Sequence, residues 1–294
     1  MRKTDFILIM TLLLLFSCKH KETKENEKLG SSNSQQIDLF DSNDNCTYVG
    51  YVNKYYFQKT NEFYIELYSK RTDINFDKIS KLTDSIIYKD DENVRRRIPL
   101  SIASKEFDFS GIRELTLFDG KQNELTKAHF IRVEFLEGSI NSYITAVYQA
   151  DSPARVNKAV YCIGNLTESL TKANYTEFSD SAMTRDIMNK LNLTYTLNLE
   201  SKHYRESINK PTFSVINMDS TAQIIERLKS GYNCIYKSSE REQIFDLVFI
   251  PIIRNTKPIL LIKSVVPDTD VDWNSLLVYD GTTYKPTESQ RIKN

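Results

Sequence analysis

Histidine, the side chain most often used as a general base, is scarce in this sequence. Only His129 and His203 follow the polar stretch at residues 19–44. A serine or cysteine nucleophile normally needs a histidine base within hydrogen-bond reach. The sequence contains no Gly-x-Ser-x-Gly elbow, no His-Glu-x-x-His pair and no glycine-rich phosphate loop. We therefore expect a surface or structural role for both histidines and predict no catalytic residue.

Three aspartates near the C-terminus have the spacing of calcium ligands. Asp268, Asp270 and Asp272 stand at alternating positions, as in the first half of a calcium-binding loop. Trp273 stands where such a loop needs glycine for its sharp turn, and Tyr279 stands where it needs a bidentate glutamate. The three aspartates form a candidate calcium site, with a solvated acidic turn as the alternative. No metal or other cofactor is expected.

Three of the four cysteines, Cys46, Cys162 and Cys234, follow residue 44. In an oxidising compartment each possible pairing of the three leaves one thiol over. No two of them have the short spacing of a zinc site. They are therefore disulfide candidates. The alternative for Cys162 and Cys234 is a buried free thiol, because both lie among strand-like apolar residues.

The chain beyond residue 44 has the residue pattern of β-strands separated by turns. Alternating aromatic and β-branched residues predict a hairpin over 46–57 and 62–69. Asp-Gly, Glu-Gly and Ser-Pro pairs mark turns between later strands, with Asp280-Gly281 the strongest hairpin signal. Further strands are predicted at 98–103, 112–120, 129–138, 140–150, 158–164, 193–200, 233–237, 244–253, 258–266 and 275–281.

Three segments are predicted to be helices. The first covers 75–88, where apolar residues recur at three- and four-residue spacing, and the second covers 180–191. The third covers 219–230, with Asp219 or Ser220 as its cap and Gly231 as its left-handed stop. Together these elements predict an α+β fold, a predominantly antiparallel β-sheet with two or three helices. The same order of a hairpin, a linker, a strand and a glycine at 130–164 and 245–281 also suggests two similar subdomains.

Charge and composition exclude a nucleic-acid partner and favour a sheet-rich body. Without residues 1–17 the chain would hold 37 basic and 38 acidic residues, a net charge of −1. Nucleic-acid-binding proteins usually carry a basic excess. The only dense basic cluster, VRRRIP at 94–99, is interpreted as a solvated strand edge. Seventeen tyrosines and 15 phenylalanines against eight glycines favour β-structure.

The N-terminus has the order of a secretory signal. Arg2 and Lys3 precede an apolar stretch of 11 residues, Phe6 to Phe16, which is shorter than the roughly 18–20 residues of a membrane-spanning helix. The segment LFSC at 15–18 resembles the lipobox of bacterial lipoproteins, with a phenylalanine that Bacteroidota lipoproteins often tolerate. The resemblance implies cleavage before Cys18, a thioether-linked diacylglycerol on its sulfur and acylation of the new amino group. A conventional signal peptide or a short N-terminal anchor is the alternative.

These features divide the chain into segments. Residues 1–17 are a predicted lipoprotein signal peptide, and 18–44 are the lipidated cysteine and a flexible tether whose polar composition cannot bury a core. The body is either two α+β sheet units, 45–165 and 166–294, or one continuous domain at 45–294. Lys19 in the second mature position favours the outer membrane of a bacterial cell envelope, on either its periplasmic or its surface face.

Besides a structural or mechanical envelope protein with no ligand, the sequence supports two functions. The first is a lipid-anchored, non-catalytic binding module of the cell envelope, with an envelope or secreted protein or a glycan as its partner besides the membrane. The alternative is an anchored hydrolase of glycan or cell-wall substrates, whose carboxylate pair needs only spatial proximity. Two carboxylates roughly 5–10 Å apart in a deep cleft would favour the enzyme. A shallow aromatic patch without perturbed acids would favour the binder.

Overall fold

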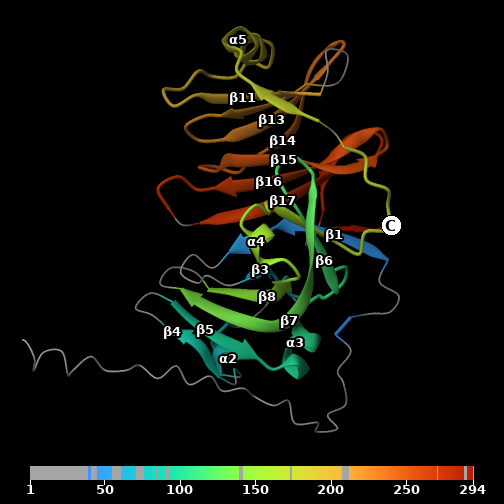
Figure 1. The fold of residues 1–294 in the computed structure, drawn as a ribbon. Coiled ribbons are helices and arrows are strands. Elements are labelled where there is room, and N and C mark those ends of the chain that lie inside the picture. The colour runs from blue at the N-terminus through green and yellow to red at the C-terminus, as the bar shows by residue number, and fades with distance from the viewer. Residues whose placement is uncertain are drawn as a thin grey trace, which may run out of the picture. The chain divides into compact units, whose positions relative to one another are not determined.

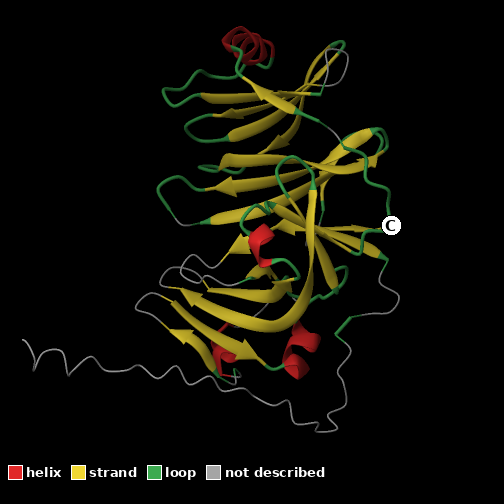
Figure 2. Ribbon diagram, viewed as in Figure 1, coloured by secondary structure: helices red, strands yellow, loops and turns green. Residues whose placement is uncertain are grey.

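The fold is known from a computed structural model that describes residues 39–40, 45–54, 61–70, 76–81, 83, 85–89, 93–138, 142–172, 174–206, 212–269, 271–287 and 290–293. The predicted signal peptide, Cys18 and most of the predicted tether lie outside the described residues. Residues 37–294 form one compact unit. The described part of this unit contains three antiparallel sheets and four helices (Figures 1 and 2).

The first sheet curls around its own hydrophobic core. β1 pairs with β9, and β2, which follows β1 after Val52 alone, pairs with β3 at the other end of the strand order. Large inward side chains such as Phe63, Leu117 and Tyr148 fill the enclosed core. Its ten strands are β1 (Cys46–Tyr51), β2 (Asn53–Lys54), β3 (Glu62–Glu66), β4 (Ile86–Lys89), β5 (Asn93–Ile98), β6 (Glu114–Phe118), β7 (Glu124–Gly138), β8 (Ser142–Ala150), β9 (Tyr161–Gly164) and β19 (Arg291–Lys293).

The second and third sheets are simpler, because each follows chain order. The second sheet contains β10 (Thr176–Phe178), β11 (Glu200–Arg205), β12 (Thr212–Asn217), β13 (Ala222–Leu228) and β14 (Gly231–Lys237). The third sheet contains β15 (Gln243–Arg254), β16 (Lys257–Val265), β17 (Asp272–Tyr279) and β18 (Tyr284–Pro286). Asp280-Gly281 lies in the turn between β17 and β18, which confirms the predicted hairpin.

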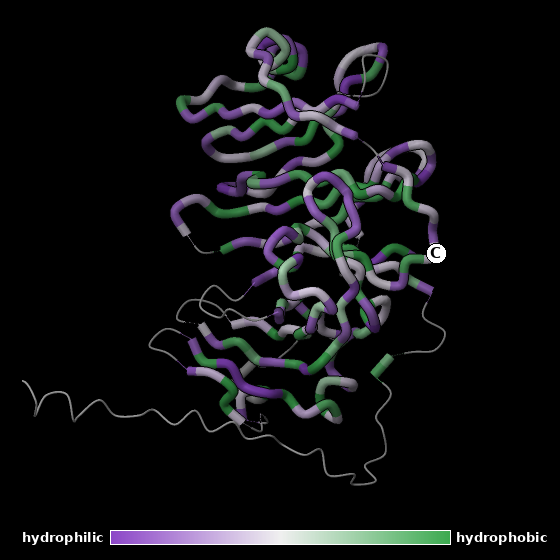
Figure 3. Tube along the Cα trace, in the orientation of Figure 1, coloured by the Kyte–Doolittle hydropathy of each residue, from purple (hydrophilic) through white to green (hydrophobic). Residues whose placement is uncertain are grey.

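The central parts of β15 and β16 in the third sheet are buried on both faces. Leu260 and Ile262 of β16 join a core shared with the second sheet, whereas Ile259 and Leu261 join a core shared with the first sheet. Successive side chains of a strand point to opposite faces, so a strand between two layers must be apolar at every position. This explains the unbroken apolar runs of β15 and β16, much of which carries the hydrophobic colour in Figure 3.

Of the four helices, α5 (Ser181–Lys190) is the longest, and it covers the second sheet. Met183, Ile187 and Met188 pack against Ile216 and Ile225 of that sheet. The Asp180 carboxylate caps α5 by accepting a hydrogen bond from the Met183 amide at 3.0 Å, so the helix predicted at 180–191 is confirmed. The other described helices are α2 (Phe76–Lys81), α3 (Leu100–Glu106) and α4 (Pro153–Val156).

The helix predicted at 219–230 is wrong, because this segment forms β13. Ile224 packs into the core shared with the third sheet, whereas Ile225 packs beneath α5. A strand with apolar neighbours on both faces loses its alternation, and its pattern imitates a helix. Gly231 follows a two-residue hairpin turn at φ +145° instead of ending a helix.

Other predicted boundaries also need correction. The helix predicted at 75–88 ends at Lys81, and Ile86–Lys89 forms β4. The strand predicted at 98–103 ends at Ile98, and α3 begins after Pro99, because proline fits the start of a helix. No strand forms at 193–199. β1 pairs with β9 and β19, so only β2 and β3 form part of the predicted first hairpin.

The prediction of a mostly antiparallel β-sheet fold is confirmed, since every strand pairing in the described residues is antiparallel. The stretches at 130–164 and 245–281 share an initial hairpin but differ in their last strand. β17 continues from β16, whereas β9 pairs with β1 and β6 and not with β8.

Candidate functional site

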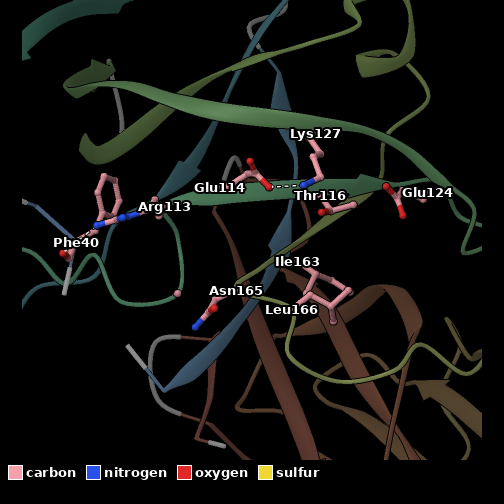
Figure 4. Close-up of a pocket in the computed structure, with 10 residues that line it drawn as sticks. Phe40, Arg113, Glu114, Thr116, Glu124, Lys127, Ile163, Asn165 and Leu166 are labelled. Atoms are coloured by element: carbon pink, nitrogen blue, oxygen red, sulfur yellow. Dashed lines mark hydrogen bonds and ion pairs between the residues drawn. The ribbon is translucent and has the colours of Figure 1, made fainter. Parts of the chain in front are cut away.

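A pocket of about 550 Å³ opens on the outer face of the first sheet, where β6, β7 and the end of β9 meet (Figure 4). Leu115 and Leu117 of β6 point into the core, so the alternating Glu114 and Thr116 point outward. The lining residues are Phe40, Gly111, Arg113, Glu114, Thr116, Glu124, Lys127, Ile163, Asn165 and Leu166.

An ion pair crosses this pocket from β6 to β7. The Lys127 Nζ lies 2.6 Å from a Glu114 carboxylate oxygen, and this hydrogen bond raises the pKa of Lys127. Both side chains are about half exposed, which leaves them accessible to a ligand. The Glu124 carboxylate lines the same pocket, and no hydrogen bond or ion pair to it is found among the described residues.

Phe40 forms one wall of the pocket. Its ring makes edge-on contacts with Phe109 and Phe130, with ring centroids 6.0 and 5.5 Å away. The Arg113 guanidinium lies 5.4 Å from the centre of the same ring and donates a hydrogen bond to the Phe40 carbonyl. Phe40, which lies in the predicted tether, therefore completes the pocket.

Tight backbone packing holds the base of the pocket. Gly111 has a φ of +73°, and a Cβ built on Gly164 would lie 1.9 Å from the Gly111 carbonyl oxygen. Next to them, Asn165 adopts a left-handed φ of +49°, and its side-chain amide donates a 3.0 Å hydrogen bond to the Cys46 carbonyl. These constraints hold Ile163 and Leu166 as the apolar base of an otherwise charged pocket.

His129 lies beside the pocket between two carboxylates. Its Nε2 is 3.1 Å from Asp151, and its Nδ1 is 3.7 Å from Glu114. All three side chains are largely exposed, and neither imidazole nitrogen meets a serine, threonine or cysteine in the described structure. Among the described residues, the His129 imidazole therefore contacts two carboxylates and is not placed to act as a base for a nucleophile.

His203 is fully buried between α5 and the second sheet. Its Nε2 lies 3.0 Å from the Thr184 hydroxyl and 3.2 Å from the Asp180 carbonyl, and its Nδ1 lies 2.8 Å from the Ser214 hydroxyl. Burial lowers the pKa of this imidazole. His203 therefore joins a helix to a sheet as a structural histidine.

The other predicted site residues are the aspartates of the candidate calcium site and the three cysteines. Asp272 forms an ion pair with Lys263 of 2.6 Å, Asp268 lies in the turn before β17, and Asp270 lies outside the described residues. No group of three or more His, Cys, Asp or Glu side chains in the described residues is placed to hold a metal ion. No disulfide joins Cys46, Cys162 and Cys234 in this structure; Cys162 is buried and Cys234 is exposed.

The sequence did not predict that the carboxyl groups of Glu66 and Asp272 lie near each other. Glu66 points outward from β3, and burial raises the pKa of its carboxyl group from 4.5 to about 7. The nearby Asp272 adds to this rise and Lys263 opposes it. These residues are distant in sequence, and only the approach of the first and third sheets brings them together.

The pocket residues themselves were also missed. The segment at 112–120 was predicted to be a strand, and its alternation does place Glu114 and Thr116 on the outer face. The sequence has no signal, however, that β7 and Phe40 complete a pocket there.

The chain was compared with family models, curated proteins and solved structures. No family model, no curated protein and no solved structure matches this chain. Among the described residues, no helix is long and apolar enough to span a membrane.

Proposed function

We propose that this chain is a lipid-anchored cell-envelope protein whose body is a non-catalytic binding module. The observation that carries the proposal is the pocket on β6 and β7, which combines accessible charges of both signs with an apolar base. Such a pocket offers hydrogen-bonding and ionic groups to a partner. Within the described structure, it brings no nucleophile to its neighbouring histidine. An envelope or secreted protein or a glycan remains the proposed partner.

The lipobox resemblance supports the anchor. We expect Cys18→Ser to move the protein from the membrane pellet to the soluble fraction, since the acyl chains would have no attachment point. Cys234→Ser is the control, because it removes an exposed thiol and leaves the lipobox intact. Membrane retention of the Cys18→Ser protein would rule out this anchor.

The pocket is tested by partner capture from envelope lysate, with quantitative mass spectrometry. Glu114→Gln with Lys127→Met removes the ion pair that crosses the pocket and should deplete the partner recovered by the unmodified protein. The control removes a comparable exposed ion pair, Asp280 with Lys285 (2.7 Å), through Asp280→Asn and Lys285→Met. Equal recovery by all three proteins would refute the pocket as the binding site.

The hydrolase is a second candidate because of the Glu66 and Asp272 carboxylates. A carboxyl group with a pKa near 7 can act as a general acid beside a second carboxyl group. If the site hydrolyses glycan or cell-wall material, Glu66→Gln should abolish the release of reducing sugar ends. Undetectable release by the unmodified protein from purified cell wall would dismiss this candidate.

We also propose the α+β class for the fold, because α5 supplies the packed outer layer of the second sheet. The division into two similar subdomains, and the unit boundary near residue 165, stay predictions that separate expression of 45–165 and 166–294 would test.

A further inference from the structure

Five cations form a continuous strip beside α4 and the β6–β7 turn. The strip consists of Lys54, Lys121, Arg155, Lys158 and Lys172. Figure 1 shows α4 beside β3 and β8, and α4 also contacts β7. Residues from four separate parts of the chain thus meet on one surface, which no sequence pattern indicates.

Hydrogen bonds join the segments that carry these five cations. Lys54 donates to the Asn157 carbonyl at 3.0 Å, next to Lys158, and Arg155 donates to the Leu125 carbonyl. Lys172 donates to the Asn123 side chain at 2.8 Å. Both Asn123 and the Lys121 backbone amide donate to the Asp119 carboxylate, which holds Lys121 in the same turn as the hydrogen-bond partner of Lys172.

None of the five cations forms an ion pair with a carboxylate among the described residues, although Lys121 lies close enough to Asp119 to help lower the pKa of its carboxyl group. Lys54, Arg155 and Lys172 donate to neutral oxygens, and Lys121 and Lys158 have no side-chain hydrogen bond or ion pair within the described residues. Three nearby carboxylates form no ion pair with the strip among the described residues. Asp119 accepts three hydrogen bonds within its own turn, Asp151 contacts His129, and Glu124 lines the pocket.

We propose that this strip is a contact surface for the anionic headgroups of a membrane. A chain with no net charge that gathers five cations without a carboxylate ion pair on one surface presents a local attraction for anions that its overall composition hides. Lysine and arginine near an anionic bilayer each add to its attraction for the protein. The inference rests on the proposed function only in choosing a membrane as the anionic surface.

The test uses the mature chain from residue 18 with Cys18→Ser, so that no lipid contributes. Co-sedimentation is measured with vesicles of phosphatidylcholine alone and of phosphatidylcholine mixed with phosphatidylglycerol. We expect binding only to the anionic vesicles. It should disappear at about 1 M salt, where the screening length falls to about 3 Å.

The strip variant combines Lys121→Glu, Lys158→Glu and Lys172→Glu, and should bind anionic vesicles at least about tenfold more weakly. The control reverses three exposed lysines elsewhere, Lys105, Lys229 and Lys237, to keep the same net charge, and should change binding less than about twofold. A second variant with glutamine at the three strip positions should give an intermediate loss without introducing negative charge.

Three results would overturn the proposal. The first is no binding of the unmodified chain to anionic vesicles. The second is an equal loss in the strip and control variants. The third is binding to soluble polyphosphate without binding to vesicles, which would assign the strip to a polymer. Because the lipid is absent, failure here is distinct from failure of the anchor, which membrane fractionation tests with the lipidated chain.

Discussion

At the scale of single residues, Glu66 couples stability to pH. Its pKa is near 7 in the folded protein and close to 4.5 when the group is exposed. The folded state therefore holds a proton that the unfolded state has lost across this range. The stabilisation is complete below about pH 4.5 and is lost as the pH rises through about 7.

We predict that Glu66→Gln removes this pH dependence. Between pH 5 and 8, the unmodified protein should lose about 1–3 kcal/mol of unfolding free energy relative to the variant, because glutamine stays neutral. Urea unfolding at both pH values measures this difference. Glu240→Gln, at an exposed carboxylate, is the control and should follow the unmodified protein. A parallel pH dependence for Glu66→Gln would show that Glu66 is not protonated near neutral pH.

Gly164 is the residue at which the pocket base tolerates no side chain. Gly164→Ala would press a methyl group into the Gly111 backbone and should cost about 1–3 kcal/mol or more of unfolding free energy. Gly120→Ala is the matched control, because its Cβ would meet nothing closer than 3.8 Å, so its effect should stay within about 0.5 kcal/mol. Thermal and urea denaturation compare the two, and equal effects would contradict the close approach of β9 to Gly111.

The sequence allowed local features to be predicted, but it did not allow contacts between residues far apart in the chain to be predicted. Asp180 was predicted to start a helix because an N-cap depends only on the next three residues. Glu114 and Lys127 were not predicted to form a site, since their pairing depends on the register between β6 and β7. Phe40 was likewise placed in the polar tether, although its ring packs on the body.

At the scale of elements, side chains protect the open edge of β15 in place of a neighbouring strand. The Asn217 side chain accepts from the Ile244 amide and donates to the Ile244 carbonyl, each at 3.0 Å. Gln122 donates to the Phe249 carbonyl at 2.9 Å, and the Thr171 amide donates to the Pro251 carbonyl. An edge satisfied in this way is closed to pairing with another chain.

We predict that Asn217→Ala destabilises the protein by about 2–4 kcal/mol, because it leaves a buried amide and a buried carbonyl of β15 without partners. Asn233→Ala, at an exposed position of β14, should change stability by less than about 0.5 kcal/mol. Urea denaturation measures both variants. A small effect at Asn217 would mean that water replaces these hydrogen bonds and that the edge is open.

At the second sheet, the element with one face in water was predicted correctly, and a strand with both faces buried was predicted incorrectly. The segment of α5 has an apolar side and a polar side, and its helix was predicted. The segment of β13 is covered by α5 on one face and by the third sheet on the other, so its alternation is lost. Its segment was assigned the wrong period because the layer order, which decides burial, is a property of the whole fold.

At the scale of the whole molecule, the three sheets build a body that carries its interaction features on its surface. The β6–β7 pocket, the neighbouring basic strip and the packed Phe40 all lie near the first sheet. The proposed tethered protein would use the strip to contact a membrane and the pocket to bind a partner. No single motif in the sequence indicates this arrangement, because each feature joins residues from separate segments.

The most direct test of the account is the intact mass of the protein extracted from membranes, followed by mass spectrometry of its N-terminal peptide. We predict a mature chain that begins at Cys18 and carries a diacylglycerol on the cysteine sulfur and an acyl group on the amino group. A membrane-extracted chain that retains residues 1–17, or that begins at Cys18 without lipid, would contradict the lipid-anchored module.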